Sequence, residues 1–253
     1  MCGRFTQCYS WEEVHRFLSV VAPAAPPNLR PRYNIAPTTM IDVIVDRGKG
    51  RELVQMRWGL VPSWSKPDAK DPTKPESKFA TFNARSEEIE GKATFRGAWT
   101  AKRRCIIPAS GFFEWTGEKG DKTPHYFTRV DGKIIGFAGL WEVWKNKTTG
   151  EDLYSCTILI HEPSRWMAKY HNRMPAILEE KDFDGWLRGD VGKEVLKPAP
   201  ADVLREWIVS SRVNKTGQGD DDSTIIDPVA TSDEAAVPEI PKVPGEPYDG
   251  SPI

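Results

Sequence analysis

Apolar residues at helical spacing mark the first predicted element. Trp11, Val14, Phe17 and Leu18 recur on one side of a helix over residues 11–20, and Ser10 is placed to cap its first turn. The pattern predicts a short amphipathic helix whose apolar side packs on the body. Three further helical patterns lie at residues 164–170, 182–188 and 201–206.

Most of the other apolar residues form short β-branched and aromatic runs bounded by Gly, Pro or Asp. This pattern is typical of β-strands. With only a few short helices beside the runs, the sequence predicts an α+β fold in which sheet dominates. The runs cover residues 41–45, 53–61, 104–115, 125–130, 134–144 and 154–160.

Two proline-rich segments interrupt the strand pattern. Residues 22–39 hold too many prolines for a helix or a central strand, so we expect an extended segment held against the body. Residues 65–77 form a polar loop that is longer than most connections in compact domains. Such a loop is either a functional lid or groove wall, or a mobile surface insertion, and the sequence leaves both open.

The formal net charge of −1 hides an asymmetry. Residues 218–253 hold nine acidic residues and one lysine, which leaves 34 basic and 27 acidic residues before them, a net charge of −8 against +7. We predict one domain over residues 2–217 and an acidic, proline-containing, disordered tail over 218–253, except around Ile225 and Ile226. A basic body with ten tryptophans suits single-stranded nucleic acid, although surface lysines are more often only solvated charge.

The cysteines argue against two kinds of site. Cys2, Cys8, Cys105 and Cys156 are scattered without a CxxC pair or neighbouring histidines, so neither a metal nor a secreted disulfide framework is indicated. No cofactor is expected. The chain has no apolar run near the length of a membrane span and no signal-peptide pattern. We expect a monomer without membrane attachment in a reducing cytoplasm, or in the nucleus if the source is eukaryotic.

Cys2 is the most informative residue. Removal of Met1 would leave an α-amine and a thiol on adjacent carbons, and such a β-aminothiol reacts with aldehydes. The amine forms a Schiff base, and the thiol then closes a five-membered thiazolidine. The α-amine has a pKa near 7.7 to 8.0 against about 10.4 for lysine, so more of it is neutral and nucleophilic near pH 7. The alternative is a second-position cysteine without chemistry.

Glu114 and His171 are candidates for proton transfer. Strand alternation in PASGFFEW places Glu114 on the same face as Phe112, where burial would raise its pKa. His171 lies in YHNRMP, just before Pro175, where a turn can direct its ring into a cleft so that it protonates a sugar oxygen. A satisfied surface glutamate is the alternative for Glu114.

Asn83 and Arg85 lie in FNARSE, at the end of an apolar segment. In the simpler interpretation, Asn83 caps a following helix and Arg85 is a surface charge. In the functional interpretation, the Asn83 amide orients the Cys2 amine, and the Arg85 guanidinium binds a phosphate through two donors.

Six motifs together resemble a known family. They are MCGRF at 1–5, PRYNIAPT at 31–38, RWGLVPSW at 57–64, NARSE at 83–87, ASGFFEW at 109–115 and HNRMP at 171–175. Each motif is short, but six in this order are specific. On these residues the chain resembles the SOS response-associated peptidase (SRAP) family from residue 2 to about residue 213.

The resemblance implies the SRAP fold, a mainly antiparallel β-barrel-like core with a few short peripheral helices and a positively charged groove leading to Cys2. It implies a sensor and shield of abasic sites in single-stranded DNA, which forms a thiazolidine DNA–protein crosslink in the DNA damage or SOS response, with lyase-type chemistry at the same site. A bacterial member would associate with the nucleoid during repair. The implied catalytic residues are Cys2, Asn83, Glu114 and His171, and the implied DNA contacts are Arg4, Asn34, Trp64, Arg85 and Arg173.

One segment departs from the family pattern. The strand before His171 commonly reads TIxTT in this family, but here residues 157–161 read TILIH, so a hydroxyl near the site is missing. We expect capture to survive this change. Two other functions stay open: a cysteine peptidase or self-processing hydrolase that uses Cys2, and a noncatalytic single-strand binder that stacks bases on its tryptophans.

Overall fold

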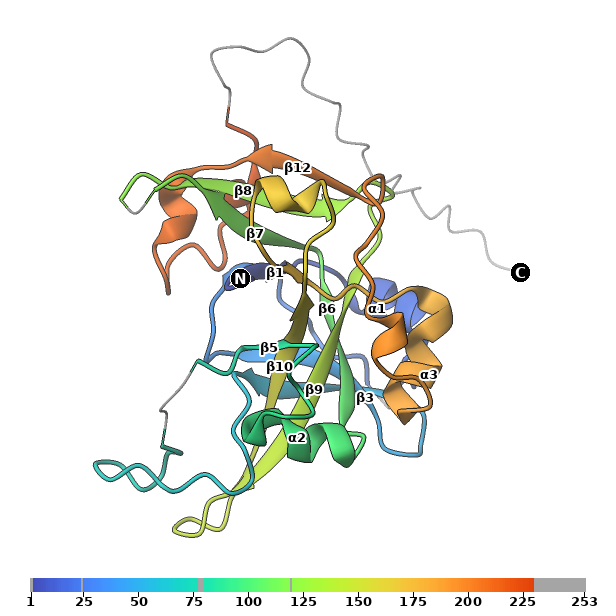
Figure 1. The fold of residues 1–253 in the computed structure, drawn as a ribbon, viewed down its shortest axis with the longest axis vertical. Coiled ribbons are helices and arrows are strands. Elements are labelled where there is room, and N and C mark those ends of the chain that lie inside the picture. Colours follow the sequence, from blue (N-terminus) through green and yellow to red (C-terminus); the bar gives the residue numbers. More distant parts are fainter. Residues whose placement is uncertain (1, 24, 77–79, 119, 230–253) are drawn as a thin grey trace, which may run out of the picture.

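The computed structural model describes residues 2–23, 25–76, 80–118 and 120–229, which form two sheets with short helices around them (Figure 1). The first sheet has the strand order β12-β8-β7-β1-β2. Its strands are β1 (Phe5–Gln7), β2 (Arg32–Ile35), β7 (Gly111–Thr116), β8 (Thr123–Arg129) and β12 (Leu204–Ile208).

The second sheet has the order β11-β10-β4-β3-β6-β9, and β5 pairs with β10 outside this path. Because β10 also pairs with β9, the strands from β10 to β9 form a closed ring of neighbours, although the sheet is not a strict barrel. The predicted α+β class with mainly antiparallel, barrel-like sheets is confirmed; β10 pairs in parallel with β4 and β5. The strands are β3 (Met40–Asp46), β4 (Arg51–Trp58), β5 (Asn83–Arg85), β6 (Arg104–Ala109), β9 (Ile135–Lys145), β10 (Asp152–His161) and β11 (Met174–Pro175).

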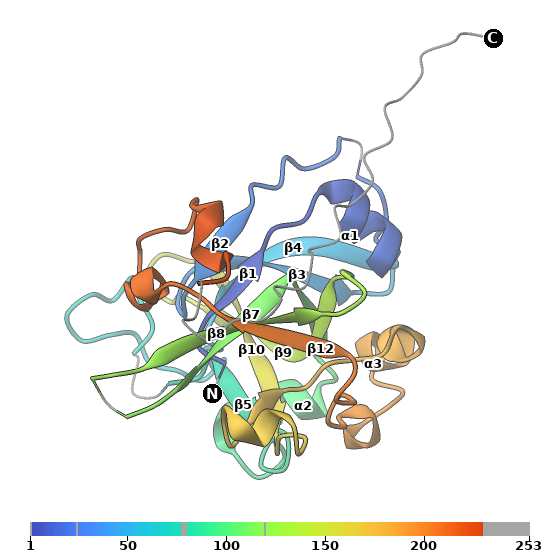
Figure 2. The same cartoon turned by 90° about the horizontal axis from the view of Figure 1, so that it is seen from above.

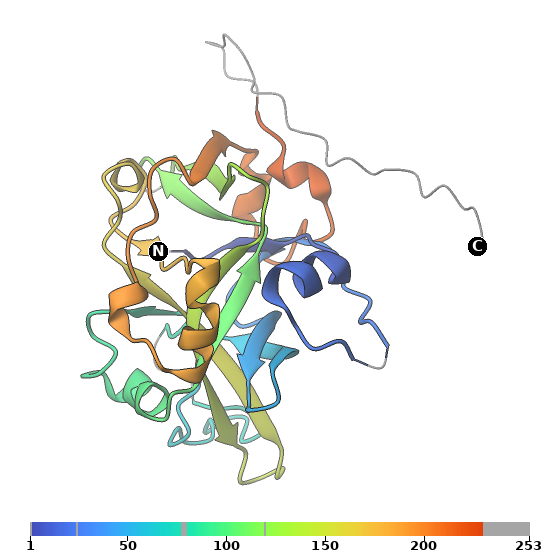
Figure 3. The same ribbon diagram turned by 90° about the vertical axis from the view of Figure 1, so that its right-hand side faces the viewer.

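Three α-helices among the described residues lie outside the sheets (Figures 2 and 3). They are α1 (Trp11–Leu18), α2 (Ala93–Thr100) and α3 (Phe183–Arg188). The predicted cap of α1 is confirmed, because Ser10 and Glu13 form a reciprocal capping box. The pattern at residues 182–188 corresponds to α3, whereas that at 164–170 gives only the 3₁₀ turn Met167–Lys169. No helix of the described residues is long and apolar enough to cross a membrane.

Two sequence predictions are wrong in detail. The helix predicted over residues 201–206 is instead a turn at 201–203 followed by the start of β12, whose residues pair with β8 from Leu204 opposite Arg129. Its helical spacing is overridden because the edge of β8 satisfies its backbone hydrogen bonds. The single run predicted over residues 104–115 is divided between β6 and β7, which belong to different sheets.

The core that supports the N-terminal strand is aromatic. The Phe5 ring packs edge to face on Trp58 with 4.9 Å between centroids and on Phe137 with 6.2 Å. Phe112 stacks on Phe127 at 5.0 Å and belongs to the same buried cluster. These side chains are large and fully buried, so they supply much of the hydrophobic free energy that holds β1 between β2 and β7.

The described part of the predicted tail, residues 218–229, contacts the first sheet through β2 and a separate buried cluster. The Tyr33 backbone N–H donates to the Asp220 carbonyl at 2.7 Å, and Ile225 is buried in a small cluster. Val209 and Pro228 form an isolated antiparallel bridge. The prediction of order around Ile225 and Ile226 therefore has a packing basis, while residues 230–253 lie outside the described residues.

We predict that Gly111→Ala destabilises the fold by roughly 1–3 kcal/mol, the usual cost of overpacking. A Cβ at Gly111 would overlap the Tyr126 ring and lie 2.5 Å from the Phe127 carbonyl oxygen, where β7 pairs with β1. Urea unfolding measures the loss. Gly97→Ala in α2 is the matched control, since its Cβ would meet its nearest atom at 3.7 Å and alanine favours a helix. Equal unfolding midpoints for the two variants would refute the overlap.

Candidate functional site

Cys2 lies at the entry to β1, between the two sheets. Phe5 pairs with Phe112, and the Phe113 N–H donates to the Arg4 carbonyl at 3.0 Å, so the antiparallel register of β1 and β7 continues toward the N-terminus. This register sets Gly3 opposite Glu114. The Cys2 side chain is 0% exposed and belongs to the main core cluster. Figure 1 shows the N-terminus beside β1, with β5 on the side of the second sheet.

Asn83 fixes the backbone of Cys2. Its side-chain Nδ2 donates to the Cys2 carbonyl oxygen at 2.8 Å, from a strand that pairs in parallel with β10 at Ile158. The other amide atom, Oδ1, is buried and makes no hydrogen bond to the described residues. A buried acceptor without a donor costs free energy, so this oxygen is ready to accept a hydrogen bond from a ligand.

Glu114 is a buried carboxyl group, 1% exposed, on β7. Burial raises its pKa to about 7, while the positive amine of Met1 and then Lys122 act in the opposite direction. Burial, followed by the charge of Glu114, raises the pKa of the Cys2 thiol well above its ordinary value. Glu114 and Cys2 therefore interact electrostatically, and Glu114 can exchange a proton near neutral pH.

His171 is half-buried, in the segment that joins the Met167–Lys169 turn to β11. The Arg173 backbone N–H donates to His171 Nδ1 at 3.0 Å, so the neutral ring carries its proton on Nε2. Burial, the amine of Met1 and Lys122 lower the pKa of His171. The ring is thus a neutral hydrogen-bond donor, and the same Met1 amine acts on His171 and Glu114.

Lys122 is a site residue that the sequence analysis missed. It lies between β7 and β8 and influences the pKa of both Glu114 and His171. It also lines a cavity of about 360 Å³, together with Arg4, Trp115, Gly120 and Asn214. No sequence motif marks a lysine in a turn. Only the pairing of β7 with β8 shows that Lys122 lies near Glu114.

The predicted DNA contacts fall into two groups. Arg4 and Asn34 are buried and bind each other at 2.5 Å. Arg4 also donates to the Val213 carbonyl, and Asn34 donates to the carbonyls of Lys215 and Gln218. Both side chains therefore hold the segment after β12 against β1 and β2.

The second group is only partly accessible, because the Arg173 side chain is 18% exposed. Arg85 pairs with Glu88 at 3.1 Å and Arg173 pairs with Glu87, so each arginine has its own carboxylate partner. Trp64 is 64% exposed. Roles of all these residues in DNA binding stay predictions.

Residues 157–161 differ from the family pattern, and the last of them, His161, is buried. Its Nδ1 donates to the Glu162 carbonyl at 2.6 Å, and its Nε2 has no hydrogen-bond partner in the described residues. Burial lowers its pKa, while Glu87 and Arg173 act on it in opposite directions. His161 thus lies near the Arg173–Glu87 pair.

The described side chains do not cluster in a way that would bind a metal ion. Across residues 2–23, 25–76, 80–118 and 120–229, no group of three or more His, Cys, Asp or Glu side chains could hold a metal ion. The polar groups that the structure brings together around Cys2 are an amide, a carboxyl and an imidazole. This set can orient a nucleophile and move protons.

Comparisons with known proteins agree on one family. Residues 1–216 match the model of the SOS response associated peptidase (SRAP) family. The abasic site processing protein YoqW of Bacillus subtilis is 34% identical over 220 residues, which are 85% of this chain and 94% of that protein. The abasic site processing protein HMCES of Gallus gallus is 32% identical over 185 residues, 62% of this chain and 54% of its own.

Solved structures agree with the sequence comparisons. A crystal structure of a protein from Bordetella bronchiseptica is 31% identical, with a TM-score of 0.69 over 83% of this chain and 100% of the other. One from Bacteroides thetaiotaomicron is 25% identical, with a TM-score of 0.77 over 90% of this chain and 100% of the other. The chain belongs to the SOS response associated peptidase (SRAP) family.

Proposed function

We propose that this protein captures abasic sites in single-stranded DNA as a covalent thiazolidine, formed by the amine and thiol of Cys2 once Met1 is removed. The observation that carries the proposal is that Cys2 lies between the sheets, with its carbonyl held by Asn83 and its thiol influenced by Glu114. The relatives YoqW and HMCES are named as abasic site processing proteins, which supports an abasic site as the substrate.

The reaction begins with the ring-closed sugar, which must open to give an aldehyde. His171 Nε2–H donates a hydrogen bond to the ring oxygen as the C–O bond breaks. Glu114 accepts the hydroxyl proton and passes it to the freed oxygen, which becomes the sugar hydroxyl. The neutral amine of Cys2 then attacks the aldehyde carbon, and loss of water gives a Schiff base. The thiol adds to the same carbon, its proton passes to the nitrogen, and the thiazolidine ring closes.

The state of the thiol favours this order of steps. The pKa of the Cys2 thiol is raised by burial and by Glu114, so the thiolate is scarce and the amine reacts first. A cysteine peptidase instead needs a thiolate with a lowered pKa beside a histidine. The Schiff base that precedes ring closure also allows β-elimination, which would give the protein a lyase-type activity on the same substrate.

We predict that Cys2→Ala abolishes the heat-stable adduct with single-stranded DNA that carries one abasic site, because the ring cannot close without sulfur. One extra residue before Cys2 abolishes it as well, since the amine becomes an amide. A denaturing gel measures the adduct. Cys8→Ala is the matched control, because Cys8 is a second free thiol that hydrogen-bonds to the Arg32 carbonyl, and it keeps the full yield. A stable adduct on the extended chain would exclude amine capture.

We also predict that capture accelerates as pH rises from about 6 to 8. Glu114, with a pKa raised to about 7, and the α-amine both lose their protons in this range. Glu114→Gln lowers the rate by about a hundredfold and leaves only the titration of the amine. Single-turnover crosslinking at each pH gives the profile. An unchanged rate and profile in Glu114→Gln would remove Glu114 from the mechanism.

The raised pKa of Glu114 also predicts that the stability of the protein depends on pH. Its pKa is higher in the folded state than in the unfolded chain, so the folded state binds the proton more tightly, and this stabilisation is lost as pH rises through about 7. The side chain in Glu114→Gln cannot ionise. We therefore expect its free energy of unfolding, relative to that of the natural protein, to rise by roughly 2–3 kcal/mol from pH 5 to pH 8. Urea unfolding at both pH values measures this. A stability difference that does not depend on pH would contradict a buried, titrating carboxyl.

A further inference from the structure

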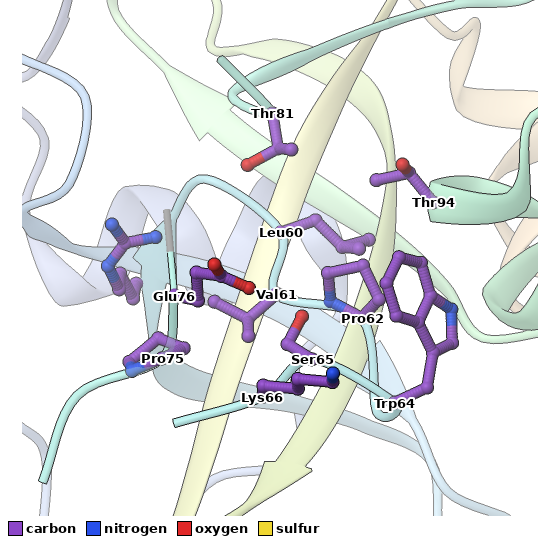
Figure 4. Close-up of a pocket in the computed structure, with 11 residues that line it drawn as sticks. Leu60, Val61, Pro62, Trp64, Ser65, Lys66, Pro75, Glu76, Thr81 and Thr94 are labelled. Carbon is purple, nitrogen blue, oxygen red and sulfur yellow. The ribbon is translucent and has the colours of Figure 1, made fainter. Parts of the chain in front are cut away.

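The loop at residues 65–76 is held in place beside the second sheet. The Trp144 indole N–H donates to the Ser65 carbonyl at 2.8 Å, which ties the loop to β9. The loop and Thr94 of α2 border a cavity of about 190 Å³ (Figure 4). These contacts favour the groove wall over the mobile insertion, the two interpretations that the sequence left open. Cys2 is not among the residues that line this cavity.

A second group of side chains does reach the candidate site. His125 lies directly opposite Glu114 in the pairing of β7 with β8. In the pairing of β8 with β12, Phe127 lies opposite Glu206. Directly paired residues, and residues two positions apart along a strand, have their side chains on the same face of a sheet. One face of the first sheet therefore carries Glu114, His125, Phe127 and Glu206.

His125 links the three strands by hydrogen bonds. Its Nδ1 lies 2.9 Å from a carboxylate oxygen of Glu206, and its Nε2 lies 2.8 Å from the Thr116 hydroxyl. A carboxylate only accepts, so Nδ1 carries a proton and donates to Glu206. The side chains of His125 and Glu206 are 9% and 18% exposed. Because water is largely excluded, this hydrogen bond holds both side chains in one orientation.

Tyr170, the residue before His171, packs on the same face. The centroid of its ring lies 5.0 Å from that of His125 and 5.0 Å from that of Phe127. Burial, the charge of Glu206 and a hydrogen bond from the phenol to the Glu206 carboxylate raise the pKa of Tyr170 to about 12. Glu206 therefore accepts hydrogen bonds from both His125 and Tyr170.

The segment that carries His171 is anchored to both sheets. Tyr170 fixes it on the first sheet, and Met174 of β11 pairs with β10 in the second. Residues 171–173 alone lie between these anchors. The N–H groups of Tyr170 and His171 both donate to the Met167 carbonyl, at 2.9 and 3.1 Å. A shift of the Tyr170 ring is therefore transmitted to the imidazole of His171.

We propose that the hydrogen bond between Tyr170 and Glu206 positions His171 for its part in ring opening. This inference rests on the proposed function, in which His171 donates to the ring oxygen of the abasic sugar. A displacement of about 1 Å in such a donor is enough to slow a reaction severely. Attack of the Cys2 amine on an aldehyde that is already open does not use His171. Tyr170 thus acts on ring opening and not on the capture that follows it.

Two substrates separate ring opening from capture. One is single-stranded DNA with an abasic site, and the other carries an aldehyde on an acyclic linker that has no hydroxyl to close a ring. Tyr170→Phe removes the phenol hydroxyl and keeps the aromatic contacts with His125 and Phe127. We expect it to lower the single-turnover crosslinking rate about tenfold on the abasic site and to leave the rate on the acyclic aldehyde unchanged. Glu206→Gln, which removes the charge and keeps the size of the side chain, is expected to show the same difference.

The dependence on His171 is measured on the abasic site. In the His171→Ala protein no ring remains to be positioned, so adding Tyr170→Phe changes the rate by less than about twofold. Tyr154→Phe is the matched control, because it removes a phenol that packs on Trp141 in the second sheet, and we expect the full rate on both substrates. No loss in Tyr170→Phe, or an equal loss on both substrates, would overturn the positioning role. A further loss of about tenfold in the His171→Ala protein would overturn it as well.

An NMR measurement without DNA keeps this inference separate from the proposed function. The ¹⁵N signals of the His171 ring report its hydrogen bond from Arg173 and its protonation. We expect Tyr170→Phe and Glu206→Gln to shift these signals and their pH titration, whereas Tyr154→Phe leaves them unchanged. Unshifted signals would overturn the inference even if capture is established. If the signals shift but the natural protein forms no crosslink, positioning is supported and capture is refuted.

Discussion

Strand β1 is held at both edges, by β2 and by β7, and the geometry of the candidate site depends on this pairing. Three residues form the strand, and its largest buried side chain, Phe5, packs on Trp58 and Phe137. The register with β7 sets Gly3 opposite Glu114. The second sheet adds the amide of Asn83. Cys2 is therefore positioned by the packing of the two sheets against each other.

Burial and charge act in opposite directions at this site. Burial favours the neutral form of Glu114, while the amine of Met1 and Lys122 favour its carboxylate, and the result is a pKa of about 7. The same burial keeps the Cys2 thiol protonated and His171 neutral. The proposed chemistry needs all three states: a base that titrates near neutral pH, an amine that reacts before the thiol, and a neutral donor for the sugar oxygen.

Local patterns in the sequence predicted much of the fold. The capped helix α1 and most strands depend on spacing within a short segment, which one sequence contains. Residues 201–206 were predicted wrongly because their strand depends on the distant edge of β8. The site residues came from motifs, but the sequence could not reveal that Arg4 and Asn34 are buried together, or that Lys122 lies near Glu114. Those relations arise only when β1, β2, β7 and β8 pair.

The central claim is that one carbon of the abasic sugar becomes bonded to both the nitrogen and the sulfur of Cys2. The most direct measurement is ¹³C NMR of the adduct, made with single-stranded DNA that is labelled at the aldehyde carbon. The account predicts that the aldehyde and hemiacetal signals are replaced by one saturated carbon in the region of thiazolidines, which correlates with the Cys2 β-protons across sulfur. A persistent imine signal, or a labelled carbon bonded to sulfur without nitrogen, would contradict it.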